Sequence, residues 1–144
     1  MNKFSFIFPG QGSQSVGMMA DFNDHPLIRS TFNEASDVLG IDFWKMASEP
    51  NEEINQTTHT QPILLTAGIA IWRLWQSKTD KTPNYLAGHS LGEYTALVAS
   101  DAIEFKDALK LWTSDPLIKA YFPQMRDIEM QDLEISAGLR KTTT

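Results

Sequence analysis

The stretch LAGHSLGEYTAL, residues 86–97, decides the fold of this chain. It begins with apolar residues that suit a buried strand and passes through Gly-His-Ser-Leu-Gly at residues 88–92. It then continues into residues that favour a helix. We interpret residues 85–87 as the strand and residues 93–98 as the helix. The pattern therefore predicts a strand, a sharp turn and a helix, with Ser90 at the turn.

Ser90 is the candidate nucleophile of this turn. A serine between a strand end and a helix start lies on a strained backbone, and the segments on either side of it come close together. Gly88 and Gly92 carry no side chains that would collide there. The turn exposes the serine hydroxyl, and free N–H groups of the first helical turn point at any group attached to it. The sequence thus predicts Ser90 as a nucleophile and the backbone N–H of Leu91 as an oxyanion donor.

The five-residue pattern by itself is common, and a turn without chemistry is the alternative interpretation. The apolar strand before it and the helix after it favour the catalytic interpretation. His89 is adjacent to Ser90, but neighbouring side chains at a sharp turn point in different directions. We therefore assign His89 a structural role, in packing or hydrogen bonding under the turn, and not the role of the base that activates Ser90.

Size and composition describe one globular domain. The chain has 144 residues, a hydrophobic content of 42% and a charged content of 21%, which are typical of a soluble protein with a core. No apolar run approaches the ~20 residues of a membrane span, and the first ten residues lack the features of a signal peptide. Cysteine is absent and the histidines have no ligand spacing, so we predict no metal site. The net charge of -6 argues against a nucleic-acid surface. We expect a cytoplasmic protein with no membrane or nucleic-acid partner.

A second motif lies near the N-terminus. Residues 3–8 alternate phenylalanine with other residues and predict the first strand. Residues 9–14, Pro-Gly-Gln-Gly-Ser-Gln, follow as a loop. A loop that leaves a strand end in an α/β fold is where ligands bind. Because the loop lacks the lysine of a phosphate-binding loop, a nucleotide site is disfavoured. A plain glycine turn is the alternative to a site whose N–H groups and amides converge on an oxyanion.

Helices are expected between the two motifs. The first begins at Pro26 and ends at Gly40. The second begins at Pro62 and has apolar residues around nearly its whole circumference as far as Trp75, which predicts that it is buried.

The remaining segments are shorter. His59 and Gln61 lie just before the second helix and are candidates to face a pocket, with a solvated loop as the alternative for His59. We interpret residues 41–46 and 50–59 as loops or short helices, residues 77–84 as a polar connection, and residues 102–112 as one more amphipathic helix.

Three motifs occur together: FPGQGSQSVGM at residues 8–18, TQP at residues 60–62 and AGHSLGEYTALVAS at residues 87–100. Together they resemble the malonyl-CoA:acyl carrier protein transacylase family of bacterial fatty acid synthesis and the related acyltransferase domains of polyketide synthases. The likeness runs in order from residue 3 to about residue 111. It implies the N-terminal portion of an α/β-hydrolase-like acyltransferase domain, with a truncated parallel sheet flanked by helices.

The resemblance also implies roles for particular residues. Ser90 is the residue acylated by malonate, the backbone N–H groups of Gln11 and Leu91 form the oxyanion hole, and Gln11 and Gln61 bind the substrate. In the family, malonyl-CoA acylates the serine, and the phosphopantetheine thiol of acyl carrier protein then removes the malonyl group. No cofactor or metal is implied. Thioester exchange through a covalent intermediate needs above all a nucleophile and an oxyanion site, which agrees with the residues themselves.

The chain departs from the family after residue 112. Family members carry an arginine that pairs with the free carboxylate of malonate, and Asp115 stands in its place. Arg126 lies too far along to take that role. The family's catalytic histidine belongs to a later part of the domain, and none of the three histidines here corresponds to it. Loss of such a histidine costs on the order of 10⁶ in rate, so we expect the chain to be nearly inactive alone.

We therefore divide the chain into residues 1–112, the N-terminal part of an acyltransferase catalytic domain, and residues 113–144, an unmatched C-terminal tail. Residues 126–139 predict a short helix with little apolar face. We interpret the tail as foreign or out-of-frame sequence on a truncated, impaired copy, whose incomplete sheet leaves apolar surface uncovered. Two other functions stay open: a non-catalytic acyl-binding module and an ordinary serine hydrolase. The hydrolase interpretation does not account for the loop at residues 9–14.

Overall fold

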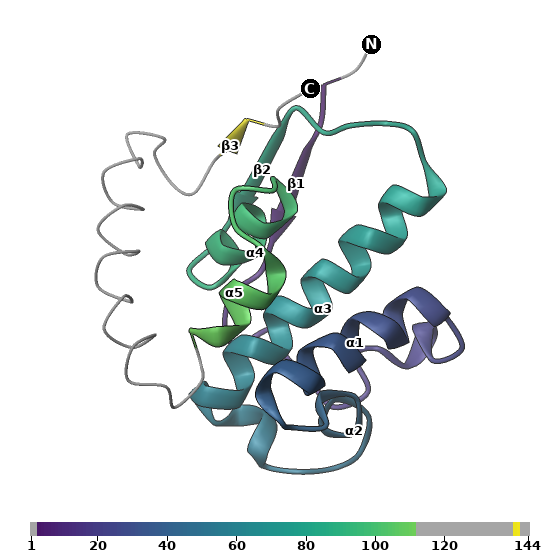
Figure 1. Ribbon diagram of the computed structural model, residues 1–144, viewed down its shortest axis with the longest axis vertical. Helices are drawn as coiled ribbons and strands as arrows, with labels where there is room; N and C mark the ends of the chain where they lie inside the picture. Colours follow the sequence, from purple (N-terminus) through teal and green to yellow (C-terminus); the bar gives the residue numbers. More distant parts are fainter. Residues whose placement is uncertain (1–2, 112–139, 142–144) are drawn as a thin grey trace.

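The computed structural model describes residues 3–111 and 140–141. Within these residues the sheet has the strand order β1-β2-β3 (Figure 1). Strands β1 (Ser5–Phe8) and β2 (Tyr85–Gly88) run parallel. Strand β3 (Arg140–Lys141) pairs antiparallel with β2. The predicted parallel pair is confirmed, and a short antiparallel strand that the sequence did not indicate is added at the edge of β2.

The helices follow one another along the chain between and after the two parallel strands. In order they are η1 (Ala20–Phe22), α1 (Pro26–Leu39), α2 (Phe43–Ser48), η2 (Glu53–Asn55), α3 (Thr57–Lys78), α4 (Gly92–Ala99) and α5 (Phe105–Lys110). The short helices α2 and η2 fall within or next to the two segments that we predicted to be loops or short helices.

The ends of α1 and the start of α2 follow from local sequence. Pro26 occupies the beginning of α1, where its missing N–H costs nothing. Gly40 ends the helix in the left-handed conformation, with φ of 69°, as predicted. Asp42 caps α2, because its side chain accepts a hydrogen bond of 2.9 Å from the backbone N–H of Lys45.

The predicted start of the second long helix was wrong. Helix α3 begins at Thr57, and Pro62 lies inside it. Threonines are weak helix formers, so the first turn carries no helical signal in the sequence. Pro62 has no N–H to donate to the carbonyl of Thr58, and Thr58 is a solvent-exposed residue of the first helical turn. As a consequence His59 and Gln61 belong to the first turns of α3 and not to a loop before it.

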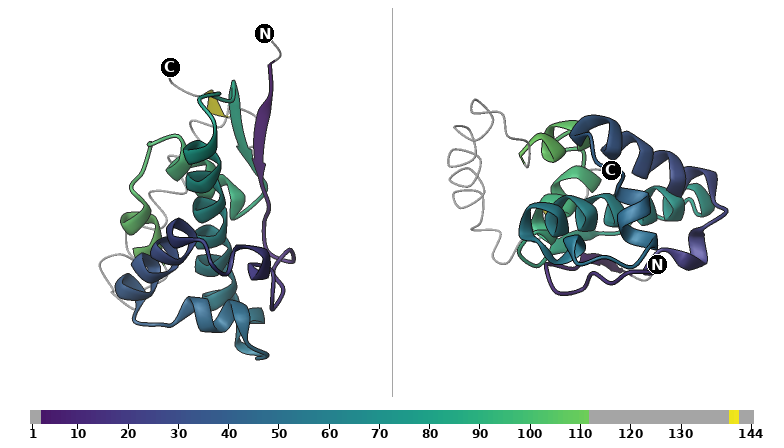
Figure 2. Two further views of the ribbon diagram at one scale, coloured as in Figure 1. Left: turned by 90° about the vertical axis from the view of Figure 1, so that its right-hand side faces the viewer. Right: turned by 90° about the horizontal axis from the view of Figure 1, so that it is seen from below.

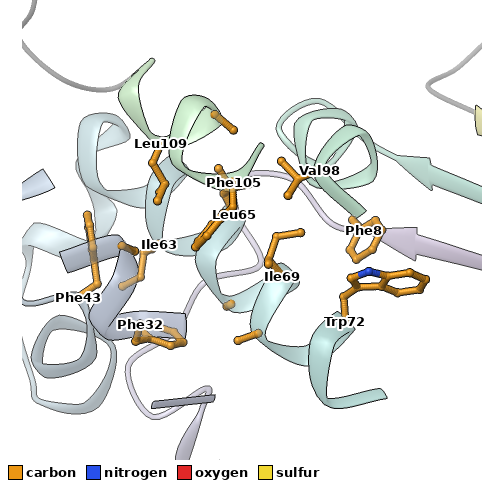
Figure 3. Packing of buried hydrophobic residues seen from close by; sticks show 14 of the residues in the cluster. Phe8, Phe32, Phe43, Ile63, Leu65, Ile69, Trp72, Val98, Phe105 and Leu109 are labelled. Atoms are coloured by element: carbon orange, nitrogen blue, oxygen red, sulfur yellow. The ribbon is translucent and has the colours of Figure 1, made fainter. Parts of the chain in front are cut away.

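The core lies between α3 and the helices that pack on it (Figure 3). From Thr60 to Ala70 helix α3 is buried almost throughout, as predicted for an apolar helix. Further along, Ile71 is 36% exposed, so the predicted burial fails there. The other side chains that fill this core include Ile28, Phe32, Phe43, Leu86, Phe105 and Leu109.

Helices α1, α3 and α5 all lie to one side of β1 and β2 (Figure 2, left). Phe6 of β1 faces this helical layer, and its ring centroid lies 5.2 Å from that of Trp72 and 5.2 Å from that of Trp75. Phe8 contacts the Trp72 ring as well, at 6.3 Å. Because side chains alternate along a strand, the residue between them, Ile7, points to the opposite face.

Helix α5 is shorter than predicted. The expected helix over residues 102–112 begins only at Phe105, because Glu104 is in an extended conformation with ψ of 145°. Trp112, Asp115, Arg126 and the helix predicted over residues 126–139 lie outside the described residues. None of the helices in residues 3–111 combines the length and the apolarity needed to cross a bilayer.

Candidate active site

Ser90 lies at the turn between β2 and α4. Three residues separate the end of the strand at Gly88 from the start of the helix at Gly92. The backbone of Ser90 has a φ of 55°, in the left-handed region that costs a residue with a Cβ about 1–2 kcal/mol. The predicted strand, strained turn and helix are therefore present, and Ser90 is exposed at the turn.

The two glycines of the motif allow a close approach of backbone to backbone. A Cβ on Gly88 would lie 1.9 Å from the carbonyl carbon and oxygen of Gly92. A Cβ on Gly92 would lie 2.1 Å from the carbonyl oxygen of Phe8 on β1. No side chain fits in either space, so the structure confirms the steric reason inferred for both glycines.

The N-terminal loop comes up against this turn. The N–H of His89 donates a 3.1 Å hydrogen bond to the carbonyl of Phe8, where β1 ends. The backbone of Gly10 is so close that a Cβ there would lie 2.6 Å from the carbonyl oxygen of His89 and 3.3 Å from Cβ of Ser90. The parallel pairing of β1 and β2 thus carries the residue next to Gly10, Gln11, to the neighbourhood of Ser90.

Gln11 and Gln61 are in contact. The Gln61 Nε2 group donates to Oε1 of Gln11 at 3.4 Å, and Nε2 of Gln11 donates to the hydroxyl of Thr57 at 3.3 Å. A third bond connects the same two parts of the chain, since Nε2 of Gln14 donates to Oδ1 of Asn55 at 3.2 Å. The structure therefore brings together two of the predicted site residues. Thr57 and Asn55 join this group through their hydrogen bonds to Gln11 and Gln14. The sequence does not indicate them, because residues 50–59 have the composition of a polar loop or short helix.

The two backbone donors predicted for the oxyanion hole are not used elsewhere in the described residues. Within residues 3–111 neither the N–H of Gln11 nor that of Leu91 donates a hydrogen bond, and the hydroxyl of Ser90 makes none either. The next N–H groups along the turn are engaged, because those of Gly92 and Glu93 each donate at 3.0 Å to the carbonyls of His89 and Ser90. Within the described residues, the Ser90 hydroxyl and the N–H groups of Gln11 and Leu91 thus remain without a hydrogen bond.

The three histidines have other surroundings. The ring of His89 lies against the N-terminal loop, because a Cβ added to Gly10 would be 3.3 Å from its Nδ1 atom. His89 is nevertheless exposed, so it does not pack under the turn as we expected. Nδ1 of His59 lies 3.3 Å from the carbonyl of Glu53. Nδ1 of His25 is buried without a partner in the described residues. In the same part of the chain, no three His, Asp or Glu side chains gather as a metal ion would require.

Comparisons with known proteins agree with this geometry. Residues 5–118 match the model of the acyl transferase domain family. The chain is 53% identical over 113 residues to the malonyl CoA-acyl carrier protein transacylase of Salmonella typhimurium and 52% identical to that of Escherichia coli. In both cases 77% of this chain is covered, and the chain spans only 37% of the length of the relative.

Solved structures show the same partial match. An acyl carrier protein S-malonyltransferase from Vibrio cholerae has a TM-score of 0.73 and 54% identity, covering 76% of this chain and 37% of that one. A malonyl-transacylase in complex with a type II polyketide synthase acyl-carrier protein has a TM-score of 0.74 and 47% identity, covering 91% of this chain and 40% of that one. The motif around Ser90, the fold and these likenesses agree, and the chain belongs to the acyl transferase domain family.

Proposed function

We propose that this chain contributes Ser90 to the transfer of a malonyl group from coenzyme A to the phosphopantetheine thiol of acyl carrier protein, in fatty acid biosynthesis. The observation that carries the proposal is the strained, exposed Ser90, whose hydroxyl makes no hydrogen bond within residues 3–111 and whose turn lies against the backbone of Gly10. The similarity to malonyl CoA-acyl carrier protein transacylases supports the choice of malonyl-CoA and acyl carrier protein as partners.

The first step forms a seryl ester. The Ser90 oxygen attacks the thioester carbon of malonyl-CoA, and its proton passes to a base. The carbonyl oxygen becomes an oxyanion that accepts hydrogen bonds from the N–H groups of Gln11 and Leu91. Collapse of this intermediate breaks the C–S bond, and the coenzyme A thiolate leaves and takes up a proton. Donors aimed at the oxyanion are worth about 3 kcal/mol each in such reactions.

The second step runs the same chemistry in the other direction. The phosphopantetheine thiol of acyl carrier protein attacks the seryl ester, the same oxyanion site is used, and Ser90 leaves with its proton restored. The Gln11 and Gln61 side chains, joined at 3.4 Å, are proposed to orient the substrate beside the serine. The two steps convert malonyl-CoA and acyl carrier protein into coenzyme A and malonyl-acyl carrier protein without any further reactant, so the proposal includes no cofactor. It places the protein in the cytoplasm, with fatty acid synthesis.

One observation favours a second function, that of a non-catalytic acyl-binding module. In the described residues no histidine or carboxylate is hydrogen-bonded to the Ser90 hydroxyl, so the general base for the first step is not among its partners there. An acyl group can be held by an oxyanion site without such a base. The chain also spans 37% of the length of its relatives. We therefore expect acylation of the chain by itself to be slow.

Intact-mass measurement after incubation with malonyl-CoA tests the proposal. The expected result is a slowly forming malonyl adduct that is absent in Ser90→Ala and present in a control, Ser77→Ala, whose serine is exposed near the end of α3. Addition of acyl carrier protein should remove the adduct. An unmodified mass with retained ligand binding would support the binding module, and free malonate as the main product would support a hydrolase.

A further inference from the structure

The peptide group that joins Gly10 to Gln11 carries one of the two N–H groups proposed for the oxyanion hole. This peptide is trans and planar, so its C=O and its N–H point in opposite directions and turn together. Whatever holds the carbonyl of Gly10 therefore sets the direction of the Gln11 N–H. The hydroxyl of Ser13 donates a 2.7 Å hydrogen bond to that carbonyl.

The backbone around this peptide rotates easily. Gly10 has no Cβ, and Gly12 has a φ of 108°, a conformation that glycine adopts far more readily than other residues. A peptide group in such a loop can turn over at little steric cost, because no Cβ of Gly10 opposes the rotation. Once turned over, the peptide would present its carbonyl oxygen where the Gln11 N–H had pointed, and that oxygen would repel an oxyanion. A hydrogen bond that holds the carbonyl thus protects the donor.

The other proposed donor, the N–H of Leu91, is held in a different way. Its peptide includes the carbonyl of Ser90, which accepts a 3.0 Å hydrogen bond from the N–H of Glu93. The backbone itself supplies this bond as the chain enters α4, so it does not depend on a side chain. The carbonyl of Gly10 lies in a loop, and there the side chain of Ser13 supplies the corresponding bond.

The rest of Gln11 is held by other side chains. On its C-terminal side, the N–H of Gly12 donates to Oε1 of Gln14 at 2.8 Å. The Gln11 side chain is itself bonded to the hydroxyl of Thr57. These bonds fix the residue and the peptide that follows it, whereas the bond from Ser13 acts directly on the peptide that carries the N–H.

We propose that Ser13 is a positioning residue that keeps the N–H of Gln11 directed at the oxyanion formed on Ser90. The inference rests on the proposed function, because it concerns a donor of the same site. The peptide that Ser13 holds begins beside the nucleophile, since a Cβ on Gly10 would lie 3.3 Å from Cβ of Ser90. Ser13 acts only through the backbone, and no contact with the substrate is assigned to it.

Three variants of the 144-residue chain test this role. Ser13→Ala removes the hydroxyl, and Ser13→Thr keeps one. Ser15→Ala is the matched control, because Ser15 is exposed in the same loop and its hydroxyl makes no hydrogen bond within the described residues. Ser13 is exposed as well, so all three variants should fold and melt within about 3 °C of the parent chain.

The first measurement is the ¹⁵N relaxation order parameter of the Gln11 N–H, which does not require acyl transfer. We expect a rigid value of about 0.85 in the parent chain, in Ser13→Thr and in Ser15→Ala. In Ser13→Ala the value should fall toward the flexible range below about 0.6.

The second measurement is the rate at which malonyl-CoA acylates Ser90, followed by intact mass over a range of malonyl-CoA concentrations. Ser13→Ala should lower the limiting rate about five- to tenfold, which is the effect of losing one ordinary hydrogen bond. This is less than the loss of about 10²–10³ that follows complete removal of an oxyanion donor. The half-saturating concentration should stay unchanged, because the oxyanion exists only after the bound substrate begins to react. Ser13→Thr and Ser15→Ala should keep the parent rate.

Several results would overturn the proposal. They are an order parameter or a limiting rate that Ser13→Ala leaves unchanged, equal losses in Ser13→Ala and Ser15→Ala, and no rescue in Ser13→Thr. A loss that appears only as a higher half-saturating concentration would assign Ser13 to substrate binding instead. Failure of the proposed function has a different signature, namely no adduct on Ser90 in the parent chain itself. In that case the order parameters alone decide whether Ser13 holds the N–H.

Discussion

Replacement of Gly88 by alanine tests the reasoning about the turn most directly. The added Cβ would lie 1.9 Å from the carbonyl carbon and oxygen of Gly92, whereas non-bonded carbons prefer about 3.5–4.0 Å. Neither atom belongs to a flexible side chain, so the end of β2 and the start of α4 must move apart. Overpacking of this kind costs about 1–3 kcal/mol, and a contact between two backbone segments is expected at the upper limit.

A loss of about 3 kcal/mol is a large part of the ~5–15 kcal/mol that stabilises an ordinary domain. It corresponds to a fall in melting temperature of roughly 6–12 °C for a chain of this size. The measurement is thermal and urea unfolding followed by tryptophan fluorescence, since Trp72 and Trp75 pack in the helical layer against β1. We also expect Gly88→Ala to lose the malonyl adduct on Ser90, because the turn can no longer hold the hydroxyl near the loop.

The control is Gly40→Ala. Gly40 has a φ of 69°, but a Cβ there would meet nothing within 4 Å. Its substitution therefore costs only the left-handed backbone conformation, about 1–2 kcal/mol. If Gly88→Ala is no more destabilising than Gly40→Ala, the close backbone approach at the turn does not require glycine at position 88. The steric explanation for the two glycines that flank Ser90 would then be wrong.

Three smaller changes test other parts of the structure. Thr60→Val should lower the free energy of unfolding in urea by about 1–2 kcal/mol, because the buried hydroxyl donates to the carbonyl of Ile54 and the isosteric valine leaves that oxygen unpaired. An unchanged urea midpoint would contradict this and indicate that water hydrogen-bonds the carbonyl in the variant. Asp42→Ala removes the cap that accepts from the N–H of Lys45 and should cost about 1 kcal/mol, whereas Asp42→Asn, which keeps the accepting oxygen, should cost less than half of that. Ser90→Gly should abolish the malonyl adduct. It should also raise the free energy of unfolding by up to about 1 kcal/mol, since glycine adopts a φ of 55° without strain. A destabilised variant would show that the backbone of Ser90 is not strained.

Much of the framework follows from local patterns. The strand, turn and helix around Ser90, the Pro26 start and Gly40 end of α1, and the strand before the Pro-Gly-Gln-Gly loop are all where the sequence predicts them. Each of these depends on the steric properties of residues that are close together in the chain. The start of α3 was missed because its first turn of threonines has no local signal, and only packing and the hydrogen bonds of Thr60 reveal it.

The site was predicted residue by residue and not as an arrangement. The nucleophile, the two oxyanion N–H groups and Gln61 could be named from motifs, and their roles stay proposals. The contact of Gln61 with Gln11, which are 50 positions apart, and the bonds to Thr57 and Asn55 came only from the structure. The sequence supplies no rule for such pairs, because exposed polar side chains are compatible with many partners.

By itself, the sequence determined that Ser90 lies on a strained turn between a strand and a helix, since glycine spacing and apolar patterning act over a few residues. Only the tertiary structure decided what surrounds that turn. The parallel pairing of β1 with β2 brings the backbone of Gly10 against Ser90 and turns Ile7 away from the helices into solvent. Both results depend on which distant segments share a sheet and on which of its faces is covered, and these are properties of the packed molecule.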